Sequence, residues 1–129
     1  MASSATVYLP LSTTVYVQVT TNAAFTQKVT ITPEGRSPIV YEGSGEGEHP
    51  IGNTTIQTPG SSSNPRGYPV TVEVESDNGS GQWQPSTVMQ GSCGIMYYNL
   101  VMVVSEDYID QDWNDSVSKF SWWVEPSQR

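Results

Sequence analysis

Residues 68–75 read YPVTVEVE, with Tyr68 and three valines at every second position. Because side chains along a β-strand point alternately to its two faces, this pattern predicts a strand with one buried and one exposed face. The same two-residue period recurs along the chain and predicts nine short strands. They span 6–9, 14–19, 27–32, 38–42, 54–58, 68–75, 86–90, 96–104 and 116–124.

The segments between these strands are rich in the residues that form turns. Examples are TPGSSSNPRG at 58–67 and SDNGSGQWQP at 76–85. No window offers ten residues of helical periodicity with capping residues. The 129 residues therefore predict one all-β domain, an antiparallel β-sandwich or a closed barrel.

The overall charge excludes some partners. Thirteen acidic residues oppose five basic ones, which gives a net charge of −8 and argues against nucleic acid and anionic membranes. Cys93, the single cysteine, is expected to be buried and inert beside an apolar run. The N-terminus lacks the pattern of a signal peptide, so we expect a cytoplasmic protein or one exported by a non-classical route. No apolar run is long enough to insert into a bilayer.

The acidity is concentrated in SEDYIDQDWNDS, residues 105–116, between the two most apolar predicted strands. This predicted loop holds Glu106, Asp107, Asp110, Asp112 and Asp115, and no Lys or Arg lies between residues 67 and 118. In an extended segment, Asp110, Asp112 and Asn114 would point to one side. All these ligands are oxygen atoms, which suits Ca²⁺ and not zinc or copper.

The acidic stretch has two alternatives to a dedicated calcium loop. An EF-hand does not fit, because Asp115 stands at the glycine position and Ser121 at the closing glutamate. Most runs of charged residues form solvated loops. Here the lack of Lys or Arg nearby in the sequence and the short length of the loop between two predicted strands weigh against that interpretation. Two Ca²⁺ ions would balance the charges of four carboxylates and would leave Asp107 as a free acceptor. Paired cations with open coordination positions can take vicinal sugar hydroxyls in place of water.

The motif SEDYIDQDWND resembles that of the two-calcium soluble bacterial lectins that bind fucose and mannose. VYLP, TTNAAFTQKVTI, YEGSGEGEHPIG and the Trp-bearing last strand have counterparts in that family in the same order. The resemblance implies a calcium-dependent, non-enzymatic carbohydrate-binding protein that takes two Ca²⁺ ions per subunit. It also implies a homodimer or higher homo-oligomer.

The resemblance also assigns the residues of the site. Glu106, Asp110, Asp112 and Asp115 would hold one ion, and Asn22, Asp112, Asn114 and Asp115 the other. The implied sugar site comprises Asn22, Ala23, Ala24, Glu46, Glu106, Asp107, Asp110, Asp112, Asn114 and Asp115. Asp107 would accept a hydrogen bond from a sugar hydroxyl, and Glu46 would face the sugar from a second rim loop.

Two positions depart from the family pattern. Ala23-Ala24-Phe25 stands where fucose-preferring members resemble Ser-Ser-Gly, which implies a lean towards mannose. In the family, the terminal carboxylate of a glycine reaches the neighbouring subunit's calcium. Here Glu125 followed by PSQR occupies that place, so either Glu125 supplies its side chain or the site and the dimer differ.

Two other function classes stay open. A structural calcium-loaded β-domain would bind the ions but leave no position for sugar. A glycoside hydrolase would need an acid/base pair of carboxylates, and carboxylates bound to calcium cannot act as general acids.

Overall fold

The computed structural model describes residues 3–107 and 113–124, which form eight antiparallel strands. The strands are β1 (Ser4–Leu9), β2 (Thr14–Pro33), β3 (Ile39–Gln57), β4 (Tyr68–Asp77), β5 (Gln84–Pro85), β6 (Thr87–Ile95), β7 (Tyr98–Glu106) and β8 (Ser116–Trp123). They pair in the order β1-β4-β2-β8-β7-β6, with β3 beside β2 and β5 beside β4. The predicted all-β, antiparallel class is confirmed.

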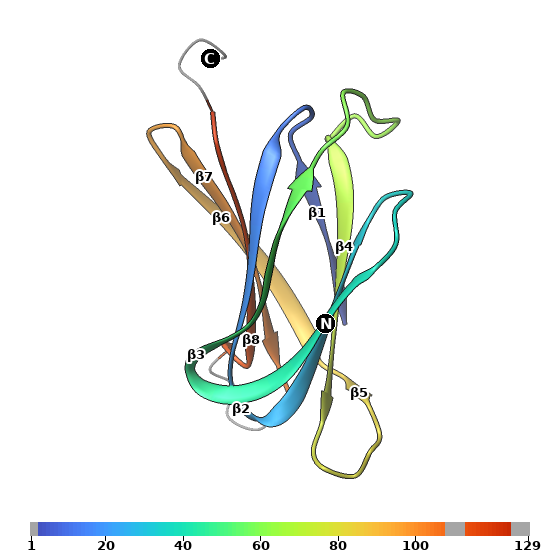
Figure 1. The fold of residues 1–129 in the computed structure, drawn as a ribbon, viewed down its shortest axis with the longest axis vertical. Coiled ribbons are helices and arrows are strands. Elements are labelled where there is room, and N and C mark those ends of the chain that lie inside the picture. The colour runs from blue at the N-terminus through green and yellow to red at the C-terminus, as the bar shows by residue number, and fades with distance from the viewer. Residues whose placement is uncertain (1–2, 108–112, 125–129) are drawn as a thin grey trace.

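The sheet folds over so that its two ends approach each other and enclose the core (Figure 1). Gln90 on β6 donates a hydrogen bond to the Thr6 carbonyl oxygen on β1 at 2.9 Å, across the gap between the two ends. The alternating side chains of β4 are buried as YPVTVEVE predicts. Its valines pack with those of β1 and β2 and with Phe120 of β8, which is fully buried.

The prediction of nine short strands is wrong for the first half of the chain. Segments 14–19 and 27–32 are parts of one strand, β2, and 38–42 and 54–58 are parts of β3. The alternation of buried side chains continues through Thr21 and Ala23, so TTNAAFTQ stays extended instead of forming a loop. Register shifts between Val19 and Gln27 bend the hairpin instead of ending its strands (Figure 1).

Glycines allow β3 to fold back on itself inside this bend. A side chain on Gly43 would come within 2.5 Å of Ile51, and one on Gly52 would overlap the ring of Tyr41. The Tyr41 hydroxyl donates a hydrogen bond to the Asn53 carbonyl oxygen at 3.1 Å and holds the ring there. The GSGEGE segment therefore shapes a curved strand where the sequence predicted a turn.

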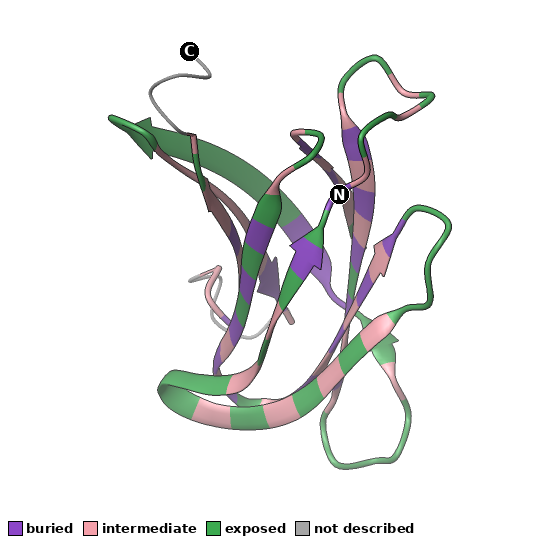
Figure 2. Cartoon of the chain, turned by 45° about the horizontal axis from the view of Figure 1, so that its top comes forward, coloured by how far each residue is buried: buried purple, intermediate pink, exposed green. Residues whose placement is uncertain are grey.

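The far end of β6 is less covered than the sequence suggests. Cys93, expected to be buried, is exposed, because nothing in the described chain packs over the outer half of β6 (Figure 2). The last strand behaves as expected for two adjacent tryptophans on opposite faces: Trp122 packs against the core and Trp123 is 61% exposed. The described residues contain no helix of the length and hydropathy that a membrane span requires.

We expect Gly52→Ala to destabilise the protein, because the new methyl group would overlap the held ring of Tyr41. The free energy of unfolding should fall by about 1–3 kcal/mol, the usual cost of overpacking. Urea denaturation measures it. Gly60→Ala is the matched control, since its methyl group would meet only Ser12 Oγ at an ordinary 3.6 Å. Equal stability of the two variants would contradict this account of the bend.

Candidate functional site

Two serines fix the ends of the acidic loop where β7 stops and β8 begins. The hydroxyls of Ser105 and Ser116 lie 2.6 Å apart, and the Ser116 backbone nitrogen donates to Ser105 Oγ at 3.0 Å. The Asp115 backbone nitrogen donates to the Ser105 carbonyl oxygen at 3.2 Å. These buried bonds hold Glu106 and Asp115, the residues next to the serines, in fixed positions.

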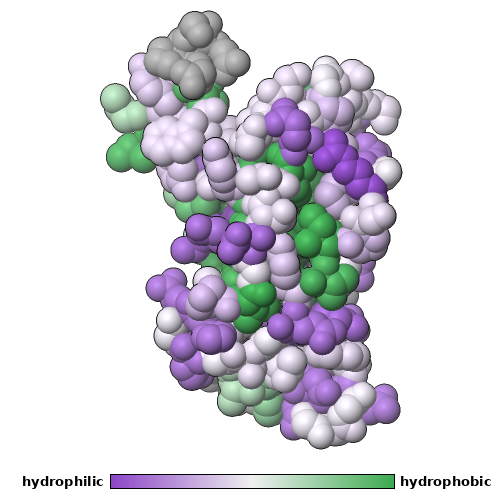
Figure 3. Space-filling model, in the orientation of Figure 1, coloured by the Kyte–Doolittle hydropathy of each residue, from purple (hydrophilic) through white to green (hydrophobic). Residues whose placement is uncertain are grey.

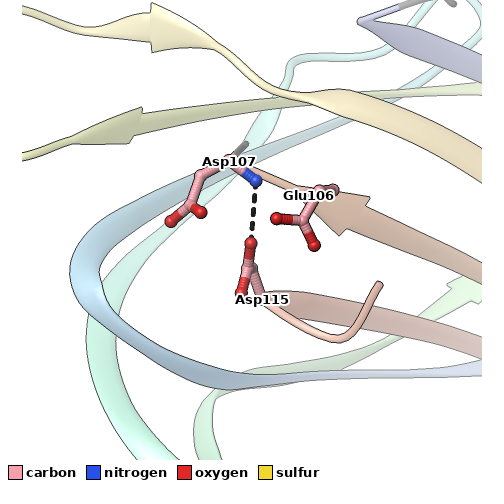
Figure 4. Close-up of side chains that lie close together, drawn as sticks. All are labelled: Glu106, Asp107 and Asp115. Carbon is pink, nitrogen blue, oxygen red and sulfur yellow. Dashed lines mark hydrogen bonds between the residues drawn. The ribbon is translucent and has the colours of Figure 1, made fainter. Parts of the chain in front are cut away.

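Glu106, Asp107 and Asp115 converge at this point. Each offers a carboxylate oxygen within 4.8 Å of the other two. The Asp107 backbone nitrogen donates to Asp115 Oδ2 at 2.7 Å, and in the view of Figure 4 the Asp115 carboxylate lies between the other two. Glu106 and Asp115 are each only 2% exposed. The three acidic residues of the predicted site that the structure describes therefore form a compact, largely buried cluster.

Among the described residues, no basic side chain forms an ion pair with the cluster, although buried carboxylates require a positive partner. The one ion pair among the described residues joins Lys28 to Glu75 at 3.5 Å, away from the cluster. The pKa of Asp115 is raised from 3.8 to about 8, mainly by burial. The neighbouring carboxylates of Asp107 and Glu106 also raise this pKa, and the hydrogen bond from the Asp107 backbone nitrogen partly opposes the rise. Without a cation, Asp115 therefore holds a proton at neutral pH.

One carboxylate oxygen in the cluster is buried without a hydrogen-bond partner among the described residues, which bears on whether a metal ion would fit. Glu106 Oε1 accepts a hydrogen bond from the Trp113 backbone nitrogen at 3.1 Å. Glu106 Oε2 is buried and has no hydrogen-bond partner among the described residues. Such an oxygen is costly unless a cation or donor satisfies it. Convergent carboxylate oxygens suit a hard cation, so Glu106 and Asp115 fit as ligands of calcium, with Asp107 beside them.

Asn22 joins the cluster to the bend of the β2–β3 hairpin. Its backbone nitrogen donates to the Asp115 carbonyl oxygen at 3.1 Å, and its side-chain nitrogen donates to the Asn114 carbonyl oxygen at 3.0 Å. Its side-chain oxygen accepts a hydrogen bond from the Glu48 backbone nitrogen at 2.7 Å. One residue of β2 thus connects three segments that are far apart in sequence.

A cavity of about 210 Å³ opens beside the cluster. Its lining comprises Asn22, Ala23, Ala24, Phe25, Glu46, Asp107 and Asp115. Six of these seven residues belong to the sugar site that the sequence predicted. Glu46 lies within β3, at the bend, and not in a separate rim loop.

Other predicted ligands stay as predictions. Asp110, Asp112 and Glu125 lie outside the described residues. Asn114 is placed beside Asn22 through its backbone carbonyl oxygen, and the role of its side chain is untested.

Some contributing residues were not predicted from the sequence. Glu48 orients Asn22, and Ser105 and Ser116 fix the loop ends. Phe25, which lines the cavity, belongs to the Ala23-Ala24-Phe25 segment that the resemblance already singled out. A signal existed only for the serines, which flank the acidic motif symmetrically. The contribution of Glu48 comes from its backbone, and sequence alone does not reveal such a role.

Comparison with known proteins gives consistent results. The model of the family "Fucose-binding lectin II (PA-IIL)" matches residues 7–124. No curated protein sequence is significantly similar to the chain.

Three solved structures share the fold. A high-affinity mannose-binding lectin of Ralstonia solanacearum is 23% identical with a TM-score of 0.70. Lectin CV2L of Chromobacterium violaceum, in complex with alpha-methyl-fucoside, is 26% identical with a TM-score of 0.69. The C-terminal domain of the BC2L-C lectin of Burkholderia cenocepacia is 23% identical with a TM-score of 0.72. Each comparison covers 93% of this chain and 96% of the other.

The family match spans nearly the whole chain and includes the elements that form the carboxylate cluster and its cavity. The chain therefore belongs to the fucose-binding lectin II (PA-IIL) family.

Proposed function

We propose that this lectin binds mannose- and fucose-type sugars through two calcium ions held by the acidic loop. The observation that carries the proposal is the buried carboxylate cluster, which pairs with no basic side chain of the described residues and lies next to a cavity lined by Asn22, Glu46 and Asp107. Bound calcium would supply positive charge and open coordination positions for neighbouring sugar hydroxyls. An open cavity beside the cluster favours this function over a purely structural calcium site.

The number of ions follows from charge. Glu106, Asp110, Asp112 and Asp115 carry four negative charges when ionised, which two Ca²⁺ ions balance. Asn22, Asn114 and Asp115 would serve the second ion together with Asp112. Since calcium prefers 6–8 oxygen ligands, this set leaves room for further oxygens from sugar or from a second subunit.

The cavity lining suggests how a sugar would be held. Asp107 is partly exposed and lines the cavity, so its carboxylate can accept a hydrogen bond from a hydroxyl. Ala23 offers no hydroxyl there, and this favours mannose over fucose. The printed names of the solved relatives, a mannose-binding lectin and a complex with alpha-methyl-fucoside, support this class of sugar.

We further propose that the protein is a homodimer that buries the outer face of β6 and β7. A groove of about 390 Å³ on this face is lined mainly by apolar side chains, among them Met89, Leu100, Met102 and Val104. At the tip of the β6–β7 turn, Ile95 is 72% and Met96 78% exposed, and Figure 3 shows hydrophobic atoms there. Exposed apolar surface of this kind is typical of an interface.

Chain geometry gives a second reason for a dimer. The backbone nitrogen of Val124 donates a hydrogen bond to the Tyr97 carbonyl oxygen. This bond lies at the end of β8 opposite to Asp115. The eight residues of β8 span about 26 Å at 3.3 Å each. No side chain at the Val124 end of the strand is long enough to reach the cluster at the other end. If Glu125 is a calcium ligand, it serves the partner subunit.

Calcium should raise the melting temperature, because it binds the folded cluster and not the unfolded chain. At about 100 times the dissociation constant the gain is about 2.7 kcal/mol, or roughly 10 °C. Differential scanning calorimetry with calcium and with chelator measures it. Glu106→Gln and Asp115→Asn should abolish the gain, whereas Glu73→Gln, on the exposed side of β4, should retain it. A gain that survives Asp115→Asn would refute the assignment.

The same measurement at several pH values tests the role of Asp115. Its pKa of about 8 in the folded protein lies above the ordinary 3.8. Between these values the metal-free folded state binds more protons than the unfolded state, so its stability falls as pH rises from about 4 to about 8. Calcium must displace this proton, so its stabilisation should be larger at pH 8 than at pH 6. Asp115→Asn should remove this contribution to the slope.

Sugar titrations by calorimetry should show that methyl mannoside binds as tightly as methyl fucoside or more tightly. Ala23→Ser restores a polar partner and should shift the ratio towards fucose by up to about 1 kcal/mol, roughly fivefold. Chelator should abolish binding of both sugars. Galactoside binding equal to that of mannoside would reject this mode of recognition.

Sedimentation velocity should show a dimer that Met102→Glu converts to a monomer, because the substitution places a charge in the apolar groove. Val40→Glu is the control, because Val40 is an apolar residue of β3 that lies outside the groove and is 49% exposed. A monomeric wild-type protein, or dissociation by both variants alike, would contradict the proposed interface. Glu125→Ala should weaken calcium affinity in the dimer if Glu125 is a ligand.

A further inference from the structure

We infer that a second cavity beside the carboxylate cluster binds the next sugar of an oligosaccharide whose terminal sugar lies at the cluster. This inference rests on the proposed sugar binding and extends it from monosaccharides to linked sugars. The second cavity has a volume of about 370 Å³, larger than the 210 Å³ of the first. It therefore has at least as much room for a ligand.

The two cavities are neighbours. Phe25 and Asp107 line both of them, so each residue forms part of the boundary between the cavities. The remaining lining comes from the β4–β5 segment and comprises Ser76, Asn78, Gln84 and Pro85. A chain of sugars that leaves the first cavity past Asp107 would enter the second directly.

The lining has the chemistry that a sugar ring needs. Phe25 and Pro85 offer apolar surface for the C–H groups of a ring, and the amides of Asn78 and Gln84 offer donors and acceptors for its hydroxyls. Of the described residues, the lining includes the Asp107 carboxylate and no Lys or Arg. Phosphorylated, sulfated or uronic sugars would therefore be disfavoured, and the geometry points to a neutral sugar.

The outer wall of the second cavity is held in place before any ligand binds. The backbone of Ser76 pairs with that of Gln84, and Asp77 Oδ1 accepts bonds from the backbone nitrogens of Gly79 and Gly81 at 2.9 and 3.1 Å. Lys28 Nζ lies 4.5 Å from the centre of the Trp83 ring and anchors the loop to β2. A wall ordered in advance loses little entropy on binding.

Calorimetry with methyl mannoside and a panel of α-linked mannobiosides, all in calcium, tests the inference. At least one mannobioside should bind the wild type on the order of 3- to 10-fold more tightly than methyl mannoside, as one or two added hydrogen bonds would give. The double variant Asn78→Ala/Gln84→Ala should lose this gain and keep the affinity for methyl mannoside. Gln82→Ala is the matched control, an exposed glutamine of the same loop outside the lining, and it should keep the gain.

The possible outcomes distinguish failure of this inference from failure of the proposed function. Normal binding of methyl mannoside without tighter binding of any mannobioside would overturn this inference and leave the proposed function intact. A gain that persists in the double variant, or that Gln82→Ala also removes, would overturn the assignment to Asn78 and Gln84. Failure of both methyl mannoside and methyl fucoside to bind would overturn the proposed function and this inference with it.

Discussion

The burial of carboxylates that pair with no basic side chain in the described part of the chain is the constraint on which the site depends. Two like unit charges 4 Å apart repel by about 4 kcal/mol at an effective dielectric constant of 20. Glu106 and Asp115 nevertheless lie almost fully buried beside Asp107. Hydrogen bonds between the ends of β7 and β8 hold these carboxylates there. Burial next to the other carboxylates raises the pKa of Asp115 to about 8. The fold therefore keeps in place an arrangement that only a proton or a cation relieves.

The strand β2 supplies the framework for this arrangement. It pairs with β8 at residues 16–21 and with β4 at residues 26–33, and between them it carries the bend that faces the acidic loop. Asn22 and Phe25 lie in that short stretch. Asn22 connects to the acidic loop and to β3, and Phe25 lines both cavities. The bend thus determines which side chains face the carboxylates, while the valines on either side belong to the core.

The sequence predicts the class of fold and the acidic site better than the details around them. Alternation in YPVTVEVE reveals β4 because burial there depends on local periodicity. The crowded carboxylates predict by their chemistry the acidic cluster that the structure shows at Glu106, Asp107 and Asp115. The bend of β3 was missed because glycines that admit Tyr41 and Ile51 look the same in sequence as glycines that form a turn. The exposure of Cys93 and the position of Gln84 depend on which segments cover one another. Such long-range packing has no local signature.

Asn22 reaches the carbonyl oxygen of a residue 92 positions later in the chain. Contacts between residues so far apart require the closure of a long loop, and folds rich in such contacts form slowly. The cluster and its anchor are thus complete only when the sheet has closed. A cation held there would not speed folding, because its site is not yet assembled when the chain collapses. It would instead slow unfolding, so that the lifetime of the folded protein would vary with the calcium around it.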